Sequence, residues 1–344
     1  MNRHLQRRFP AEWEEQDAIL LAWPHDQTDW ASIRDEAEQV YCGIIASILP
    51  HQTVMLTTPD PDRTRRRLAT AGINSDRLRL YQLPSNDTWA RDFGPLCVFD
   101  QGRPHLLDFT FNGWGNKFTA ELDNRITAEL HRLGAFGTTP LIAGELVFEG
   151  GSIESDGQGT LMTTSDCLLE KNRNPHLTRD QLDVWLRRTF GADQVLWLDS
   201  GYLSGDDTDS HIDTLARFAP DRTIIYQGCD DPSDEHFGAL QEMAAQLEQF
   251  RSLDDQPYRL LEVPLPQPIM AEEGYRLPAG YANFLVINDA VLVPTYQDPA
   301  DRKALEIIAE AFPDRQIIGI DCRALIKQHG SLHCVTMQIP KGVL

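Results

Sequence analysis

The chain of 344 residues has a formal net charge of −21, with 41% hydrophobic and 24% charged residues. This hydrophobic content is typical of a globular protein rather than a disordered one, and the negative field disfavours binding to nucleic acid or to an anionic membrane surface. The composition predicts a cytoplasmic protein that binds neither of them, whereas a cationic ligand is compatible with its charge.

Short apolar strands alternate with helical patterns along the chain. Apolar runs predict strands over residues 18–23, 53–57, 78–83, 96–99, 106–111, 141–148, 159–163, 195–198, 213–218, 223–226, 258–263, 283–287, 291–293, 316–320 and 334–339. Helical periodicity predicts helices over residues 31–49, 62–71, 120–133, 178–190, 234–250 and 301–312. Most strands are near-continuous apolar runs, which indicates burial on both faces. A strand–strand–helix–strand unit recurs roughly every 60 residues, so we expect one repetitive α/β domain over residues 1–344.

Several further classes of protein are excluded by what the sequence lacks. The six cysteines form no Cys-x-x-Cys pair and are too sparse for a disulfide scaffold, which predicts reduced thiols. Residues 1–15 are charged and have no apolar signal core, and the longest apolar stretches are far shorter than the ~20 residues that cross a membrane. The Walker A, His-Glu-x-x-His and dinucleotide-glycine motifs are absent.

Two acidic segments each allow a structural and a functional interpretation. Residues 86–95 place Trp89 and Asp92 in a loop between two predicted strands. This loop is either a turn with an ion pair and a core tryptophan, or an aromatic wall beside a carboxylate that suits a flat cation. Glu149 precedes two glycines at the end of a strand, so it is either a solvated acid at a turn or a carboxylate that points into a site.

The most polar run of the chain, residues 205–213, contains His211 and Asp213. A calcium loop is one interpretation, but no glycine lies mid-loop and no bidentate glutamate follows. A solvated loop with a capping histidine is another. The third is that His211 and Asp213 alternate on one side of an incipient strand, which brings an imidazole and a carboxylate together for acid–base chemistry.

Cys334 lies at a predicted loop-to-strand junction. Such a cysteine can be a nucleophile, although a buried structural thiol is the common alternative. His329 and His333 nearby suggest zinc, but no further ligand follows at the required spacing.

These candidates recur at the interval of the repeat. Asp92 and Glu149 are 57 residues apart, Glu149 and His211 are 62 apart, and His211 and Cys334 are 123 apart. The skipped position falls near residue 272, and Asn283 begins a strand just beyond it. A closed ring of similar units would bring these positions to one axial pocket.

Several segments carry a resemblance to a known family. They are residues 9–14, 22–24, 89–92, 112–115 (which includes Trp114), 149–151, 167–175, 211–213 and 332–336. In their order and spacing the sequence resembles agmatine deiminases and, more broadly, the peptidylarginine-deiminase type of guanidine-modifying enzymes, the penteins. The resemblance implies a five-bladed α/β propeller, with pseudo-fivefold ββαβ modules around a central active-site pocket.

The resemblance also implies a role for each candidate. Cys334 is the nucleophile and His211 the general acid and base, while Asp92 and Asp213 hold the guanidinium and Glu149 lies beside them. The substrate-binding residues are then Trp89, Asp92, Trp114, Asp213 and Asn283, with no metal and no other cofactor. The sequence departs from the family pattern at residues 327–331, where several agmatine deiminases carry a run of glycines. This difference affects the shape of the pocket for the substrate tail.

The implied reaction converts agmatine and water to N-carbamoylputrescine and ammonia through a thiouronium on cysteine, a step of polyamine biosynthesis from arginine. The enzyme is then a hydrolase of carbon–nitrogen bonds in linear amidines, with a small cationic guanidine as its partner. A deiminase of free or C-terminal peptidyl arginine, an amidinotransferase and a non-catalytic cation-binding protein remain alternatives. The sequence leaves homo-oligomerisation open.

Overall fold

The computed structural model describes residues 7–344. The predicted absence of a signal core falls partly on residues 1–6, which lie outside the described residues. Within the described residues, none of the helices has both the length and the apolar character that crossing a membrane requires.

Within these residues, sixteen strands form five small sheets. The four-stranded sheet contains β16 (Met337–Pro340), β1 (Gln16–Ala22), β2 (Thr53–Thr58) and β3 (Leu78–Gln82) in that order. The three-stranded sheets are β4 (Leu96–Asp100), β5 (Arg103–Thr110) and β6 (Leu141–Val147); β7 (Glu154–Ser155), β8 (Thr160–Thr164) and β9 (Gln194–Leu198); β10 (Ala216–Ala219), β11 (Thr223–Gln227) and β12 (Arg259–Val263); and β13 (Leu285–Ile287), β14 (Ala290–Thr295) and β15 (Gln316–Asp321).

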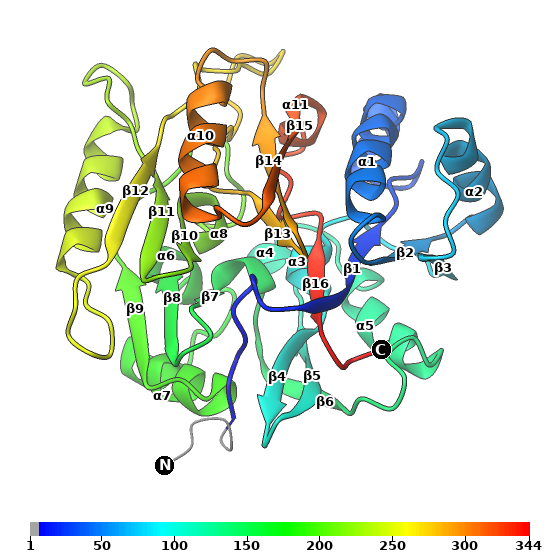
Figure 1. Cartoon of the computed structure of the whole chain (residues 1–344), viewed down its shortest axis with the longest axis horizontal. Helices are drawn as coiled ribbons and strands as arrows, with labels where there is room; N and C mark the ends of the chain where they lie inside the picture. The colour runs from blue at the N-terminus through cyan, green and yellow to red at the C-terminus, as the bar shows by residue number, and fades with distance from the viewer. Residues whose placement is uncertain (1–6) are drawn as a thin grey trace.

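The sheets share one connectivity, in which an antiparallel pair is followed by a parallel strand. A parallel pair needs a crossover, and a helix supplies it in each sheet: α1 (Arg34–Ile48), α5 (Ile126–Arg132), α7 (Arg179–Phe190), α9 (Phe237–Gln249) and α10 (Asp301–Ala311). A further helix, α2 (Pro61–Thr70), leads to β3. Figure 1 shows α2, α5, α7, α9 and α10 around the outside of the molecule.

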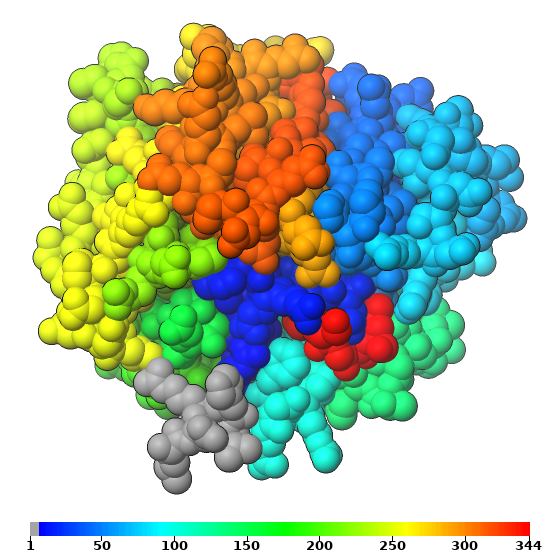
Figure 2. Space-filling model, in the orientation of Figure 1, coloured from blue at the N-terminus to red at the C-terminus, as the bar shows by residue number. Residues whose placement is uncertain are grey.

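The four-stranded sheet joins the two ends of the chain, because β16 pairs with β1 in antiparallel register. Figure 2 shows the N-terminal residues, in blue, crossing the middle of one face with C-terminal residues, in red, beside them. Strands β1 and β16, which are far apart in the sequence, therefore lie side by side.

Short helical turns make up the rest of the regular structure. They are α3 (Ala90–Phe93), α4 (Gly113–Asn116), α6 (Ser165–Leu168), α8 (Ile212–Leu215) and α11 (Arg323–Ile326), with 3₁₀ turns η2 (Asp29–Ile33), η3 (Asp123–Arg125) and η4 (Gly150–Ser152). The predicted helices over residues 31–49 and 120–133 overlap η2 and η3, and the sequence missed the other short turns, because a single turn is too short to show helical periodicity.

The predicted α/β class and the long helices are confirmed, and Thr178 forms the predicted capping box with Gln181. The predicted strand over residues 213–218 is partly wrong, because its first residues form α8 and only Ala216–Ala219 is extended.

Burial on both faces is confirmed for β1, β2, β11 and β14. It is wrong for β3, β5, β6, β12 and β15, which are partly exposed; all of these but β5 are edge strands.

Candidate active site

Six of the eight predicted site residues occupy corresponding places in the fold. Each of the six lies just before the strand that begins the antiparallel pair of a sheet: Asp92 before β4, Glu149 before β7, His211 and Asp213 before β10, Asn283 before β13 and Cys334 before β16. The interval between the candidates in the sequence skips one position, and Asn283 occupies the corresponding place in the fold. The direct contacts described below bring these residues into one buried cluster.

His211 and Glu149 form the innermost pair of the cluster. His211 Nε2 lies 2.9 Å from Glu149 Oε2, and the Arg173 guanidinium contacts the same carboxylate at 3.0 Å to each oxygen. Burial opposes ionisation of Glu149, but the His211 hydrogen bond and the Arg173 charge hold the pKa of Glu149 below its ordinary value. Glu149 is therefore a fixed anion that orients the imidazole through Nε2.

The other nitrogen of His211 faces Asp92. Nδ1 lies 3.6 Å from Asp92 Oδ1 and has no hydrogen-bond partner. Burial disfavours the imidazolium, yet the charge of Asp92 and contacts with Cys167 and Glu149 raise the pKa of His211 well above its ordinary value. Since Glu149 occupies Nε2, the free Nδ1 is the nitrogen that can exchange a proton with a bound molecule.

Asp92 is held by two N–H donors. The Gly151 backbone donates to Oδ1 at 3.0 Å and Trp114 Nε1 donates to Oδ2 at 2.9 Å. A Cβ on Gly151 would lie 2.5 Å from His211 Nδ1, so only glycine allows this approach. Burial, with other carboxylates nearby, raises the pKa of Asp92 to about 6.

Asp213 and Cys334 meet at the other side of the cluster. Asp213 Oδ2 accepts a hydrogen bond from His333 Nδ1 at 2.7 Å, whereas Oδ1 is buried without a partner. Burial opposes ionisation of Asp213, but His333 holds the pKa of Asp213 below its ordinary value. Asp213 Oδ1 and His211 Nδ1 are the buried polar atoms of the predicted site residues without a partner. Because buried polar atoms are normally paired, a ligand would satisfy these two.

The Cys334 thiol is placed by Asn283 and Asp213. Cys334 Sγ lies 3.4 Å from Asn283 Oδ1 and 3.9 Å from Asp213 Oδ2. Asn283 also donates to the Asp213 carbonyl at 3.2 Å. Burial and the nearby charges of Asp213 and Asp92 raise the pKa of Cys334 well above its ordinary value, so the resting group is a thiol.

A small cavity of about 40 Å³ opens onto this cluster. The residues that line it are Asp29, Asp87, Trp89, Asp92, Trp114, Phe118, Asp207, Thr208, Gln328, His329, Gly330 and Cys334. Four of the eight predicted site residues thus face the cavity. The other four lie directly behind it, since His211 and Glu149 back onto Asp92, and Asp213 and Asn283 back onto Cys334.

Trp89 forms a wall of the cavity and is fixed from behind. Its Nε1 donates to Asp87 Oδ2 at 3.0 Å, and Trp30 donates to the other oxygen of the same carboxylate at 2.8 Å. A Cβ on Gly330 would lie 2.2 Å from the Trp89 ring, so the segment before the thiol crosses this ring closely. The indole can therefore cover a flat cation without reorganisation.

Comparison with known proteins identifies the family. The family model for the Porphyromonas-type peptidyl-arginine deiminase matches residues 8–340. The chain belongs to this family. An agmatine deiminase from Pseudomonas syringae pv. tomato is 31% identical over 360 residues, covering 96% of this chain and 95% of the relative.

Solved structures of the family have the same fold. One from Porphyromonas gingivalis, provisionally named an arginine deiminase, is 49% identical with a TM-score of 0.92 and covers 98% of this chain and 100% of that one. A cysteine-to-serine variant of agmatine deiminase from C. jejuni with substrate bound is 38% identical with a TM-score of 0.91 and covers 98% of both chains. The mixed α/β pentein-type fold is therefore confirmed.

The calcium interpretation of residues 205–213 does not fit the geometry. Asp209 is paired with Lys117 and Arg173, both at 2.7 Å, and Asp206 accepts from Thr208 and Ser210 of its own loop. These carboxylates are already satisfied by cations and donors. The predicted alternation of His211 and Asp213 on a strand is also wrong, because His211 precedes α8 at its N-cap position, without a side-chain capping hydrogen bond, and Asp213 lies in its first turn.

Two groups of side chains have ligand atoms close enough for a metal: Glu149, Cys167 and His211, and Glu12, Glu154 and His333. Each group already forms an ion pair with an arginine: Arg173 pairs with Glu149, and Arg217 pairs with both Glu12 and Glu154. A divalent cation would be repelled by these guanidinium charges. The zinc suggested by His329 and His333 also fails, because His333 binds Asp213 whereas His329 binds the Gly205 carbonyl.

We expect treatment with EDTA to leave the activity of this enzyme unchanged, because Lys117 and Arg173 pair with Asp209, donors of its own loop satisfy Asp206, and an arginine pairs with the carboxylates of each cluster. An ammonia-release assay before and after exhaustive chelation measures this. Activity that is lost in EDTA and restored by a divalent cation would contradict the expectation.

The sequence did not predict the role of the residues that support the cluster. Arg173 holds Glu149, His333 holds Asp213, and Glu12 and Arg217 lie behind His333 with contacts of 3.1 and 3.0 Å to its Nε2. Arg173, Glu12 and His333 lie in the segments that carry the family resemblance, and this membership could have indicated that they belong to the site. Their partners are distant in the sequence, which is why their roles could not be read from it.

Proposed function

We propose that this protein is an agmatine deiminase. The observation that carries the proposal is the charge of the cavity. Asp29, Asp87, Asp92 and Asp207 line it, and none of the described lining residues is lysine or arginine. Agmatine is cationic at both ends and suits such a cavity, whereas arginine carries a carboxylate that would need a counter-cation.

Substrate binding is the first step. Asp92, which lines the cavity, and Asp213, whose Oδ2 lies 3.9 Å from the Cys334 sulfur, accept hydrogen bonds from the guanidinium and leave its central carbon facing Cys334. Asp213 Oδ1 gains the partner that it lacks in the free protein. The positive charge of the substrate also stabilises the thiolate, which offsets the effect of the two aspartates on the pKa of Cys334.

Chemistry then takes two steps. The thiolate forms a bond to the guanidinium carbon, His211 gives its Nδ1 proton to the departing nitrogen, and ammonia leaves a thiouronium on Cys334. His211, now neutral, takes a proton from water as its oxygen bonds to the same carbon. Breaking the carbon–sulfur bond returns the thiolate and releases N-carbamoylputrescine, whose oxygen loses a proton to solvent.

The fold and location complete the proposal. A single five-bladed propeller over residues 1–344 is supported by the five sheets with one connectivity and by the site residue at the corresponding place in each. The free state of all six cysteines supports a cytoplasmic location.

The decisive assay measures ammonia release from agmatine, free arginine and a peptide with C-terminal arginine. We expect the highest kcat/KM with agmatine. Higher kcat/KM with either arginine substrate would instead support an arginine deiminase, the activity in the name of the P. gingivalis relative. Saturable binding of all three without turnover would indicate a cation-binding protein.

The pH dependence of agmatine turnover should report Asp92. Asp92 binds the guanidinium only when ionised, and burial has raised its pKa to about 6. As the pH falls through this value Asp92 becomes neutral, so kcat/KM should fall by about tenfold per pH unit. Asp92→Asn has no such ionisation and should lack this acidic limb; an unchanged limb in the variant would assign it to another group.

A further inference from the structure

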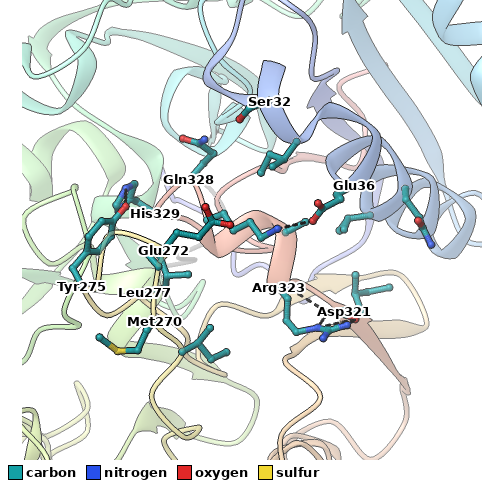
Figure 3. Close-up of a pocket in the computed structure, with 18 of the residues that line it drawn as sticks. Ser32, Glu36, Met270, Glu272, Tyr275, Leu277, Asp321, Arg323, Gln328 and His329 are labelled. Carbon is teal, nitrogen blue, oxygen red and sulfur yellow. Dashed lines mark hydrogen bonds and ion pairs between the residues drawn. The ribbon is translucent and has the colours of Figure 1, made fainter.

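Two hollows meet at the segment that leads to Cys334. One is the active-site cavity, and the other is a groove of about 1130 Å³ whose lining includes none of the predicted site residues. Gln328 and His329 line both hollows. Figure 3 shows His329 and Tyr275 next to each other at one end of the groove, with Gln328 nearby. These two neighbouring residues therefore separate the cavity from the groove.

The separating segment is anchored to three other parts of the chain. Lys327 pairs with Glu36 of α1 at 2.7 Å, and Gln328 donates to the Asp29 carbonyl in η2 at 2.9 Å. His329 Nδ1 lies 2.8 Å from the Gly205 carbonyl. Because a carbonyl oxygen only accepts, Nδ1 carries the proton in this contact.

Tyr275 holds the other side of the His329 ring. The two rings stack at 5.6 Å with an angle of 12°, and Tyr275 Oη lies 3.4 Å from His329 Nε2. His329 adopts φ +67°, a left-handed conformation that glycine takes without steric penalty and histidine does not. A bulky side chain therefore occupies a position whose backbone conformation favours glycine.

The cavity runs from a buried end to a more open one. Cys334 and Asp92 are buried, while Asp29 is exposed and Asp207 and His329 are half-buried. A guanidinium at Cys334 therefore directs its alkyl chain toward Asp207 and His329, and Asp207 can pair with a terminal ammonium there. Any longer chain would reach the His329 ring.

We propose that His329 is a specificity-determining residue, which limits the length of the substrate by closing the cavity against the neighbouring groove. The inference rests on the proposed function, because it assumes that an amine-terminated guanidine enters this cavity. Removing the ring should join the cavity to the groove and admit longer substrates.

The test uses His329→Gly in the full chain, since glycine suits the left-handed backbone. Ammonia release is measured with agmatine and with a series of guanidinoalkylamines lengthened one methylene at a time. We expect the wild type to prefer agmatine, and the variant to raise kcat/KM for longer amines relative to agmatine by about tenfold or more.

Two further variants make the test specific. Asp255→Gly makes the same backbone change at φ +59°, on an exposed residue that lines neither hollow, and should leave the chain-length profile unchanged. Tyr275→Ala removes the stacking partner of His329 and should shift the chain-length profile toward longer amines, by less than His329→Gly does. If circular dichroism shows that His329→Gly does not fold, Tyr275→Ala is used for the test in its place.

The outcomes separate the two claims. If the wild type turns over agmatine and a folded His329→Gly variant keeps the wild-type chain-length profile, the role of His329 is overturned while the proposed function stands. If the wild type turns over none of these amines, the proposed function fails and the inference fails with it.

Discussion

Replacement of Cys334 by alanine should reduce agmatine turnover by more than about a thousandfold and leave the fold intact. The side chain is small, and its role in the proposed reaction is to form the covalent bond to the guanidinium carbon. Its hydrogen-bond acceptor Asn283 remains tied to the backbone of His333 and Asp213 when the thiol is lost. Ammonia release measures the loss, and circular dichroism and the Tm establish that the variant is folded.

The covalent intermediate gives an independent check. Mass spectrometry of wild-type enzyme, acid-quenched during turnover, should find the amidine adduct on Cys334. Cys229→Ala is the matched control, because this buried thiol donates to the Asp231 backbone carbonyl at 3.7 Å and packs in an apolar core cluster that contains none of the predicted site residues, so the variant should keep wild-type turnover. An adduct on any of the other five cysteines would refute the assignment of the nucleophile.

Asp92→Asn and Asp213→Asn should each lower kcat/KM for agmatine by about tenfold to a hundredfold or more. Losing a charge-assisted hydrogen bond costs about 1.5–3 kcal/mol, and an amide turns an acceptor into a donor that faces the guanidinium. At position 92 the amide also meets the N–H groups of Gly151 and Trp114, so two acceptor sites of the carboxylate are reduced to one.

Asp207→Asn provides the comparison. Asp207 lines the more open end of the cavity, with its carboxylate 3.7 Å from His329 Nδ1, and it contacts neither Cys334 nor His211 in the structure. Its substitution should mainly raise KM for agmatine through weaker attraction of the terminal ammonium, with little change in kcat. If Asp207→Asn were as damaging to kcat as Asp213→Asn, the special role of His211 and Asp213 would be lost and residues 205–213 would form one extended cation site.

The sequence by itself determined the α/β class, the recurrence of the structural unit and the chemical types at the site. These features are local, because hydrophobic periodicity, turn residues and the spacing of polar motifs can all be read along the chain. The regular interval even indicated the fifth position, where Asn283 precedes β13 and contacts Cys334.

Only the tertiary structure decided how these residues act together. It placed His211 and Asp213 on a helical turn rather than on a strand, and it left Nδ1 of one and Oδ1 of the other without partners. It also paired Glu149 with Arg173 and Asp213 with His333. A buried charge is tolerated only where another part of the chain supplies its partner, and those partners come from distant segments that no local pattern connects.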